Sequence, residues 1–543
     1  LSESTCTNPD GNSFFFSQVP LHVHRWSRTL YTSDGRFARA TESPYANGFR
    51  KDSEILAHTA YGQPLLVRGL NGDYTRYAYG RFGRSFYQWT QTVGARVDAL
   101  NGGNAAAGQG PGLALGVESR THYAWCTSAG GTADCPSGAV YRQTTEGTEQ
   151  PRQWAYFDAL ARPVLQVGEL LNMDTSLGLR RSAVCQDYDV QGRGFRQSAP
   201  RMLLGSDTPT LSHLQNYCEQ VPANHWTESQ FDVLGRNVVQ WSPEESGRAK
   251  TEIRYEGLIT RTTLPDTGDG RVRERIEERN VLGELVEVRD GEGLGAVATY
   301  AYSATGDLLS VTRTAAGATA VSRMFYDRMG RKIRTEDPDA GVWNYRYNGA
   351  GELIAQYDGA YVQPALPVPT SAIRTLQEFD GRGRVIEKRS FAAGATAGVY
   401  HSWRYDLSLG GPFTSLFGVL TNESSMGGYD AGGQSEVSFD RIHHYDDLGR
   451  PVGSGTQIDY QGPYHRAAAH YDVRGRIWKT MDASHRWLKT EYGARGFQLA
   501  QCESSALDAG TSCATNHENT YIRVQTVDAW GKVTLEQRGN NLE

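Results

Sequence analysis

Tyr188-Asp189-Val190-Gln191-Gly192-Arg193 is the stretch that decides the fold, because the same phrase returns along the 543-residue chain. The phrase consists of an aromatic residue, Asp, two variable residues, Gly and Arg. Internal repetition determines the architecture, so it has to be recognised before any other feature. The positions shared by the six well-matched copies are Tyr188, Asp189, Gly192 and Arg193; Phe231, Asp232, Gly235 and Arg236; Tyr326, Asp327, Gly330 and Arg331; Phe379, Asp380, Gly383 and Arg384; Tyr445, Asp446, Gly449 and Arg450; and Tyr471, Asp472, Gly475 and Arg476.

Each phrase has the residues that a tight turn between two strands requires. The aromatic residue ends one strand, the Asp side chain opens the turn, and Gly takes the position with positive φ. A strand follows, for example the alternating residues 331–336. The phrase therefore predicts a β-hairpin, whose aromatic residue packs on the next hairpin and whose Arg pairs with a neighbouring Asp or carbonyl.

The spacing of the phrases fits two strands and two turns per unit. Between Arg279 and Tyr347 successive copies begin 21 to 24 residues apart. A propeller blade needs four strands and roughly 40 residues, and the Leu spacing of leucine-rich repeats is missing. The 61 Gly, 29 Tyr and 11 Trp also favour turns and strands. We therefore expect an all-β fold of stacked hairpins.

The quality of the repeats divides the chain into two parts. Residues 151–543 contain the well-matched copies of the phrase and several degenerate ones, such as Phe157-Asp158. Residues 1–150 contain only stretches that resemble the phrase weakly. The first part also contains a Gly/Ala-rich stretch at 101–116, for which we expect a loop. Both parts are expected to belong to one continuous body.

The seven cysteines suggest disulfides and therefore an exported protein. Cys126 and Cys135 flank a short polar loop, and Cys502 and Cys513 flank another, an arrangement that suits a bond across the end of a hairpin. Zinc is the competing interpretation, but neither pair has the spacing of a zinc knuckle. Cys185–Cys218 is expected as a third, longer-range pair, and Cys6 is then left over.

The charge and hydropathy of the chain exclude two classes of partner. The formal net charge is −6 and the isoelectric point is about 6.2, so no nucleic-acid partner is expected. No apolar run has the length needed to span a bilayer.

No catalytic, cofactor-binding or metal-binding residue is predicted. His22 and His24 share a strand face but have no third ligand, and the adjacent His443 and His444 point to opposite faces. The stretch 266–270 lacks the oxygen ligands of a calcium loop. Asp337-Pro338 could take part in acid–base chemistry, but the sequence 337–341 is explained better by a turn between repeats. Phosphate-loop, dinucleotide-binding and Gly-x-Ser-x-Gly patterns are also missing.

The repeated Tyr-Asp-x-x-Gly-Arg phrase, together with the stretch EDPDAGVWNYRYNGAGELIAQYDG at 336–359, resembles the YD/RHS-repeat family. The resemblance is dense between Phe157 and Val533. It implies a β-spiral that forms part of a hollow shell. In bacterial RHS effectors and Tc-type toxin complexes such a shell encloses a toxic C-terminal polypeptide, and in animal teneurins a similar barrel serves adhesion.

What this resemblance implies for the chain is a structural role. We expect a segment of a longer, exported bacterial shell whose partner is an enclosed toxin encoded outside these residues. Other components of a toxin complex or secretion system are further expected partners. Family members also contain a self-cleaving aspartyl region, and the chain lacks its expected arrangement, so we expect no enzymatic activity.

Two alternatives remain at this stage. The chain could be an exported surface module whose Tyr and Trp side chains bind carbohydrate or another protein. It could also be a self-cleaving protease, which would require a second catalytic Asp beside a scissile bond near the end of the core.

Overall fold

The computed structural model describes residues 27–45, 48–81, 83–92, 116–126, 135–171, 180–203, 214, 216–244, 247–265, 271–291, 295–359, 372–396, 398–406, 416–427, 438–446, 448–459, 462–493, 495–504, 513 and 520–539. These residues form 37 strands and two short 3₁₀ helices, η3 (Cys218–Gln220) and η4 (Ala223–His225). The prediction of an all-β fold is therefore confirmed. Within the described residues, no helix has the length and apolar character needed to cross a membrane.

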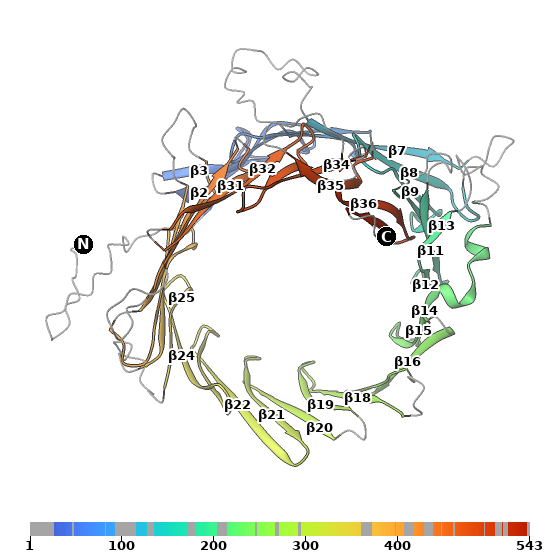
Figure 1. Cartoon of the computed structure of the whole chain (residues 1–543). Coiled ribbons are helices and arrows are strands. Elements are labelled where there is room, and N and C mark those ends of the chain that lie inside the picture. The colour runs from blue at the N-terminus through green and yellow to red at the C-terminus, as the bar shows by residue number, and fades with distance from the viewer. Residues whose placement is uncertain are drawn as a thin grey trace. The chain divides into compact units, whose positions relative to one another are not determined.

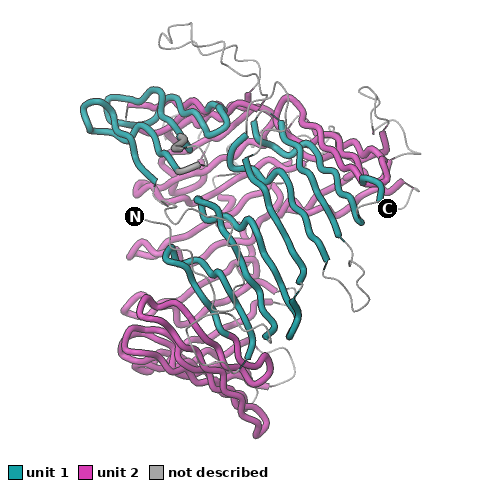
Figure 2. Tube along the Cα trace, turned by 90° about the vertical axis from the view of Figure 1, so that its left-hand side faces the viewer, with its two compact units in different colours: residues 1–74, 344–464 teal, residues 75–343, 465–543 magenta. Residues whose placement is uncertain are grey.

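The chain forms two compact units, and each is built from two separate stretches of sequence (Figure 2). Unit 1 comprises residues 1–74 and 344–464, and unit 2 comprises residues 75–343 and 465–543. The division at residue 150 that the repeats suggested concerns repeat quality, and it stays a prediction.

Unit 1 contains the strands at the start of the chain and those from β24 to β31, of which β24 begins three residues before the boundary at residue 344. They are β1 (Arg28–Tyr31), β2 (Ala38–Tyr45), β3 (Gly48–His58), β4 (Pro64–Gly69), β24 (Gly341–Tyr347), β25 (Leu353–Asp358), β26 (Arg374–Phe379), β27 (Val385–Phe391), β28 (Val399–Tyr405), β29 (Leu420–Met426), β30 (Phe439–Tyr445) and β31 (Pro451–Ile458).

Unit 2 contains the remaining strands. They are β5 (Tyr74–Tyr79), β6 (Ser85–Gln91), β7 (Gly116–Trp125), β8 (Tyr141–Gly147), β9 (Gln153–Phe157), β10 (Pro163–Glu169), β11 (Arg181–Tyr188), β12 (Gly194–Ser198), β13 (Arg201–Leu203), β14 (Trp226–Phe231), β15 (Asn237–Glu244), β16 (Gly247–Glu256), β17 (Ile259–Thr263), β18 (Glu274–Arg279), β19 (Leu285–Gly291), β20 (Ala296–Tyr302), β21 (Leu308–Ala315), β22 (Ala318–Tyr326), β23 (Lys332–Asp337), β32 (Tyr464–Tyr471), β33 (Ile477–Met481), β34 (Trp487–Tyr492), β35 (Gln498–Ser504), β36 (Thr520–Val527) and β37 (Val533–Arg538).

Within each unit most strands pair antiparallel with the next strand in the sequence, as the run from β14 to β22 illustrates (Figure 1). The register shifts by one residue at the aromatic residue of each well-matched phrase, for example between Asp187 and Tyr188. The glycine of the phrase has a positive φ, such as 86° at Gly192. A bulge followed by a left-handed glycine lets the strand reverse in few residues.

The largest apolar core lies in unit 2, between the sheet around β9–β11 and the segment that precedes β14. Leu165, Ala183 and Cys185 are fully buried there, and Tyr156 and Trp226 are 3% exposed. A second cluster joins Leu171 to Val524 and Val527, which come from the C-terminal part of the same unit. Parts of the chain that are far apart in sequence therefore pack together within unit 2.

Both units contain polar contacts between early strands and late turns. In unit 2 the Thr92 hydroxyl donates a hydrogen bond to the Val473 carbonyl at 2.7 Å, across 381 residues of sequence. Arg476 likewise pairs with Glu149 at 2.7 Å. In unit 1 Arg382 pairs with Asp52 at 3.4 Å. Turns of later repeats therefore lie against early segments of their own unit: Thr92 directly follows β6, Glu149 lies in the turn after β8, and Asp52 lies on β3.

The structure contains disulfides between Cys126 and Cys135, Cys185 and Cys218, and Cys502 and Cys513, with Cα–Cα distances of 5.8, 5.7 and 5.4 Å. These are the pairs that the sequence predicted. Cys6 and the Gly/Ala-rich stretch at 101–115 lie outside the described residues. The long-range bond at Cys185 lies inside the main core of unit 2, where it ties the segment around η3 to β11.

Candidate functional site: the repeated turn

The turn formed by each phrase is the recurring polar site of the chain. At Asp189 the backbone N–H donates to the Arg193 carbonyl at 2.9 Å, and the Gly192 N–H donates back to the Asp189 carbonyl at 2.9 Å. These two bonds close the hairpin between β11 and β12. The same pair of backbone bonds closes the hairpins at Asp232, Asp327, Asp380, Asp446 and Asp472.

The Asp side chain holds the turn from inside. One oxygen of Asp189 accepts the backbone N–H groups of Gln191 and Arg193 at 3.0 and 2.9 Å, and the other accepts Nε of Arg193 at 2.6 Å. The arrangement recurs at Asp232–Arg236, Asp327–Arg331, Asp380–Arg384, Asp446–Arg450 and Asp472–Arg476. Arg thus pairs with the Asp of its own phrase.

Consecutive hairpins are joined through the Arg and the next aromatic residue. The Arg162 guanidinium lies 4.5 Å from the ring centre of Tyr188, and the Tyr188 hydroxyl donates to the Pro163 carbonyl at 2.9 Å. Tyr188 therefore contacts both the Arg of the preceding phrase and the residue after it. The same double contact occurs for Arg236 and Tyr255, Arg384 and Tyr405, and Arg476 and Tyr492.

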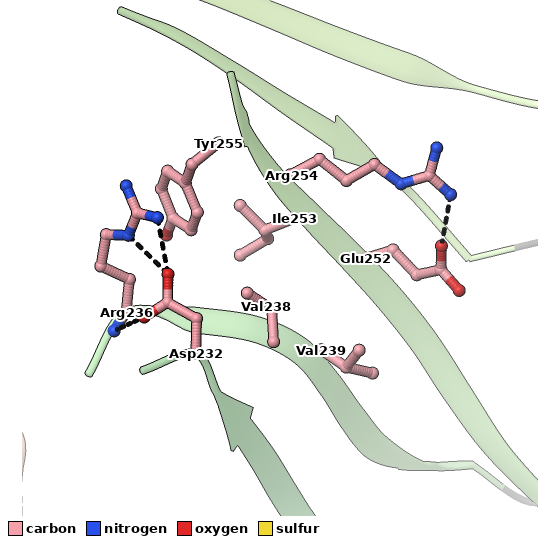
Figure 3. Close-up of a pocket in the computed structure, with 8 residues that line it drawn as sticks. All are labelled: Asp232, Arg236, Val238, Val239, Glu252, Ile253, Arg254 and Tyr255. Atoms are coloured by element: carbon pink, nitrogen blue, oxygen red, sulfur yellow. Dashed lines mark hydrogen bonds and ion pairs between the residues drawn. The ribbon is translucent and has the colours of Figure 1, made fainter. Parts of the chain in front are cut away.

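Figure 3 shows one of these joints as a shallow pocket in unit 2. The Asp232–Arg236 pair lies beside the Tyr255 ring, and Arg236 is 4.2 Å from the ring centre. The remaining lining residues are Val238, Val239, Glu252, Ile253 and Arg254. Glu252 and Arg254 pair with each other at 3.4 Å. Among the lining residues, Arg236 and Tyr255 come from consecutive hairpins and join them.

The electrostatics of the turn favour the charged form of its Asp. The backbone N–H of Arg236 has the largest effect and lowers the pKa of Asp232. Burial opposes it, and the hydrogen bond from the Arg236 guanidinium lowers the pKa further, so that it lies below the usual range. The pKa of Asp327 is lowered in the same way by Arg331. Burial raises the pKa of Tyr188, so its hydroxyl stays protonated and able to donate. The turn is therefore an ion pair at neutral pH.

Degenerate copies keep the geometry with other residues. Ala161 takes the glycine position after Asp158, at a φ of 62°. At Asn280 the side-chain amide donates to Glu284 at 2.6 Å, while its oxygen accepts the Glu284 N–H at 3.0 Å. Asn348 and Glu352 form the same pair. The Asn-x-x-Gly-Glu turn is therefore a version of the Asp-x-x-Gly-Arg turn in which donor and acceptor have changed places.

Sequence reasoning missed the turn at Asp482. Asp482 holds Arg486 with the same three side-chain bonds, but His485, at a φ of 61°, replaces the glycine. No aromatic residue precedes Asp482, since position 481 is Met. The spacing of Asp and Arg four residues apart is the signal that could have found it.

The other residues considered for chemistry lie in structural settings. Asp337 accepts the N–H groups of Asp339 and Ala340 and the Ser322 hydroxyl, so it holds the turn before β24. Nε2 of His443 lies 3.5 Å from Oε1 of Glu423 on β29. Among the described residues no group of three or more His, Cys, Asp or Glu side chains is placed to hold a metal ion. His22, His24 and the stretch 266–270 lie outside these residues.

No protein-family model matches the chain, and no curated protein matches it in sequence. Solved structures do match. A chain of the Tc holotoxin pore of Photorhabdus luminescens aligns with 95% of this chain at a TM-score of 0.52 and 12% identity. A crystal structure of TcdB2-TccC3 aligns with 95% of the chain at 12% identity and a TM-score of 0.32.

The chain spans only 28% of the matched holotoxin chain and 32% of the TcdB2-TccC3 chain. At this identity the likeness concerns the fold. The antiparallel series of hairpins and the TM-score of 0.52 together show that this chain has a fold like that of the matched part of the Tc holotoxin chain.

Proposed function

We propose that the chain is a wall segment of an exported bacterial toxin shell, which encloses a toxic polypeptide encoded outside these residues. The observation that carries the proposal is the interlocked series of turns. In the six well-matched phrases the Asp holds its own Arg, and several Arg side chains lie over the ring of an aromatic residue in the next hairpin. Paired hairpins satisfy one another's backbone groups, so such a wall can grow without open edges between repeats.

Isolation of the cargo is the proposed mechanism. A continuous wall of hydrogen-bonded hairpins keeps proteases from the enclosed chain and keeps the toxic chain from the producing cell. The three disulfides suit an oxidising environment and support export. Further components of a toxin complex or secretion system would deliver the shell. The proposed role is structural and assigns no catalytic step to the chain.

Protease protection tests this role. The protein is produced with its natural flanking sequence and an unstructured reporter peptide fused at its C-terminal end, and the digestion rate of the reporter is compared with that of the free peptide. We expect digestion to slow by at least about tenfold, because enclosure lowers the population open to the protease. Removing residues 296–337, which form the two hairpins β20–β23, should abolish protection. Asp327→Asn is the control, since it changes one turn and leaves the wall complete. Protection that survives the deletion would contradict the container role.

A second candidate is a binding module for carbohydrate or protein. Trp125 is 77% exposed, and its ring begins a line that continues across neighbouring strands through Tyr141 and Phe157. Tyr141 and Phe157 are half-buried, and an exposed ring such as that of Trp125 can stack on a sugar as well as on a protein side chain. Binding on a glycan array that is lost in Trp125→Ala, with the fold retained, would favour this candidate over the shell.

A further inference from the structure

Unit 2 is built from two stretches of sequence, residues 75–343 and 465–543, and the second stretch contacts the beginning of the first (Figure 1). The strands of the second stretch pair in ladders with their neighbours in sequence, from β32 to β37. The strands from β6 to β11 pair in the same way among themselves. The contacts between the stretches come from three turns at one end of the later hairpins, residues 472–476, 493–497 and 528–532.

The first two of these turns contact Glu149, which lies in the turn after β8. Its carboxylate pairs with Arg474 at 3.4 Å and with Arg476 at 2.7 Å. Gly496 of the second turn packs on the backbone of Glu149, and a Cβ at position 496 would overlap the Glu149 carbonyl oxygen. The late turns therefore fit the early segment closely, and one of them leaves no room for a side chain.

The second and third turns contact the end of β10 and the start of β11. Arg495 pairs with Glu169 at 3.3 Å, and the Glu169 side chain is only 1% exposed. The Ser182 hydroxyl donates a hydrogen bond to the Ala529 carbonyl at 2.5 Å. An apolar cluster lies in the same region and consists of Leu170, Leu171, Phe497, Leu499, Val524 and Val527. The three late turns therefore meet the early segments in the order of the sequence.

We call these contacts the latch. It consists of residues 149, 169–171 and 182 on the early side and residues 474, 476, 495–499, 524, 527 and 529 on the late side. A ladder is a continuous series of backbone hydrogen bonds, whereas the latch consists of separate side-chain contacts and one small apolar cluster. Local opening takes place where few contacts have to break. The latch is therefore the place in unit 2 where the two stretches can separate most easily.

The ion pairs of Glu149 make the latch sensitive to salt. The side chains of Glu149, Arg474 and Arg476 are between 25% and 35% exposed, so dissolved ions screen their attraction. Glu169 is buried, and its pair with Arg495 is screened less. Raising the ionic strength should therefore weaken the contacts of Glu149 first.

We propose that unit 2 opens at the latch, so that residues 465–543 move away from β6–β11 while the hairpins on both sides stay folded. The charge of Glu149 holds the latch closed, and the closed state loses stability as the ionic strength rises. The proposal concerns the two stretches of unit 2 alone, and it does not depend on the enclosure of a cargo.

Pulsed electron paramagnetic resonance measures the opening in the 543-residue chain. Spin labels are attached at A159C and S484C, two exposed turn positions on the two sides of the latch, in a Cys6→Ser background that prevents labelling of that cysteine. The labelled parent should show one main distance. Gly496→Ala should add a longer distance, with a population at least about tenfold that of the open state in the parent, because the new Cβ overlaps Glu149.

Gly283→Ala is the matched control. Gly283 lies in the same kind of turn at a φ of 84°, and a Cβ there has no other atom within 4 Å. This variant therefore has the backbone strain of a side chain at positive φ without the overlap, and its distances should equal those of the parent.

Glu149→Gln tests the role of charge. In the parent, added salt should increase the population of the longer distance, because it screens the pairs of Glu149. In the variant this population should already be high at low salt and should change little when salt is added.

A longer distance in Gly496→Ala and in Glu149→Gln, with the strand content of the parent in circular dichroism, supports the latch. A single unchanged distance in both variants would overturn it, and so would a longer distance of equal population in Gly283→Ala. A new distance that comes with a loss of strand content would also overturn it, since the late hairpins would then unfold instead of moving as one body.

Discussion

The aspartate of each turn does three tasks with one carboxylate. In the Asp158 turn one oxygen accepts two backbone N–H groups at 2.9 Å, and the other binds Arg162 Nε at 2.7 Å. These two N–H groups have no carbonyl partner within the tight turn, and the carboxylate oxygen accepts their hydrogen bonds instead. The ion pair contributes less to the stability of the fold, since water screens the attraction between charges at a protein surface. Most of the contribution of Asp158 is therefore expected from its hydrogen bonds to the backbone.

Asp158→Ala should lower the free energy of unfolding by about 1–2 kcal/mol, because it leaves two turn N–H groups without their acceptor. Asp158→Asn keeps that acceptor and loses the ion pair, so it should cost about half as much. Urea denaturation of the two variants measures the difference. Equal losses in both variants would show that the ion pair dominates.

Acid should weaken the turns. The pKa of Asp232 and of Asp327 is lowered in the folded chain, first by the backbone N–H of the paired Arg. A carboxyl whose folded pKa is depressed contributes stability that is complete above its unfolded pKa, about 4, and disappears as pH falls through the folded value. The melting temperature of Asp327→Asn should thus lie below that of the parent at pH 7, and the gap should close at acid pH. A gap that does not change with pH would contradict this.

Contacts between Arg and Tyr side chains join one hairpin to the next. Tyr255 on β16 receives Arg236 on its ring and donates its hydroxyl to the Asn237 carbonyl at 3.1 Å. Both contacts connect one hairpin to the next. Their loss should therefore destabilise the packing between two hairpins rather than a single turn. Local loosening of this kind is visible in hydrogen exchange before the whole sheet unfolds.

Tyr255→Phe should therefore speed amide exchange in β15 and β16 and lower the stability by about 0.5–1.5 kcal/mol, because one hydrogen bond is removed and the ring is kept. Tyr61→Phe is the control, since Tyr61 is 87% exposed in a turn. Faster exchange throughout unit 2 in the Tyr255 variant would contradict this, because it would indicate that all hairpins of the unit unfold together and not one after another.

Sequence reasoning reached the elements but not all of their contacts. The Tyr-Asp-x-x-Gly-Arg phrase predicts its own hairpin because every bond that closes the turn lies within five residues, as at Asp189. It did not predict that Arg162 meets Tyr188, since that contact depends on how far each strand runs before the next turn. The Asp482 turn was not recognised in the sequence because His485 stands where the phrase has a glycine.

At the scale of the whole molecule, contacts across hundreds of residues decide how repeats lie against one another within a unit. The contact of Thr92 with Val473 spans 381 residues, and that of Ser182 with Ala529 spans 347. Nothing in the local pattern marks these partners, since hydroxyl side chains and backbone carbonyls occur in every repeat. The disulfides were predictable for the opposite reason: cysteines are few, and two pairs are close in sequence.

Removing the Cys185–Cys218 bond should destabilise the chain by about 3–4 kcal/mol, because it closes a loop with a sequence separation of 33 residues in the core of unit 2. C185S/C218S measures this in urea denaturation without reductant. The C126S/C135S pair, with a separation of 9, is the control and should cost less, since a shorter loop constrains the unfolded chain less. The opposite order would show that packing at these sites outweighs chain entropy.

The central claim is that hairpins of this kind build a wall around a cargo, and electron cryomicroscopy of the protein purified with its natural flanking sequence tests it most directly. The account predicts a closed wall of antiparallel hairpins that surrounds a cavity containing density for an additional polypeptide. A solid sheet stack, or an open surface without an interior space for a polypeptide, would contradict it.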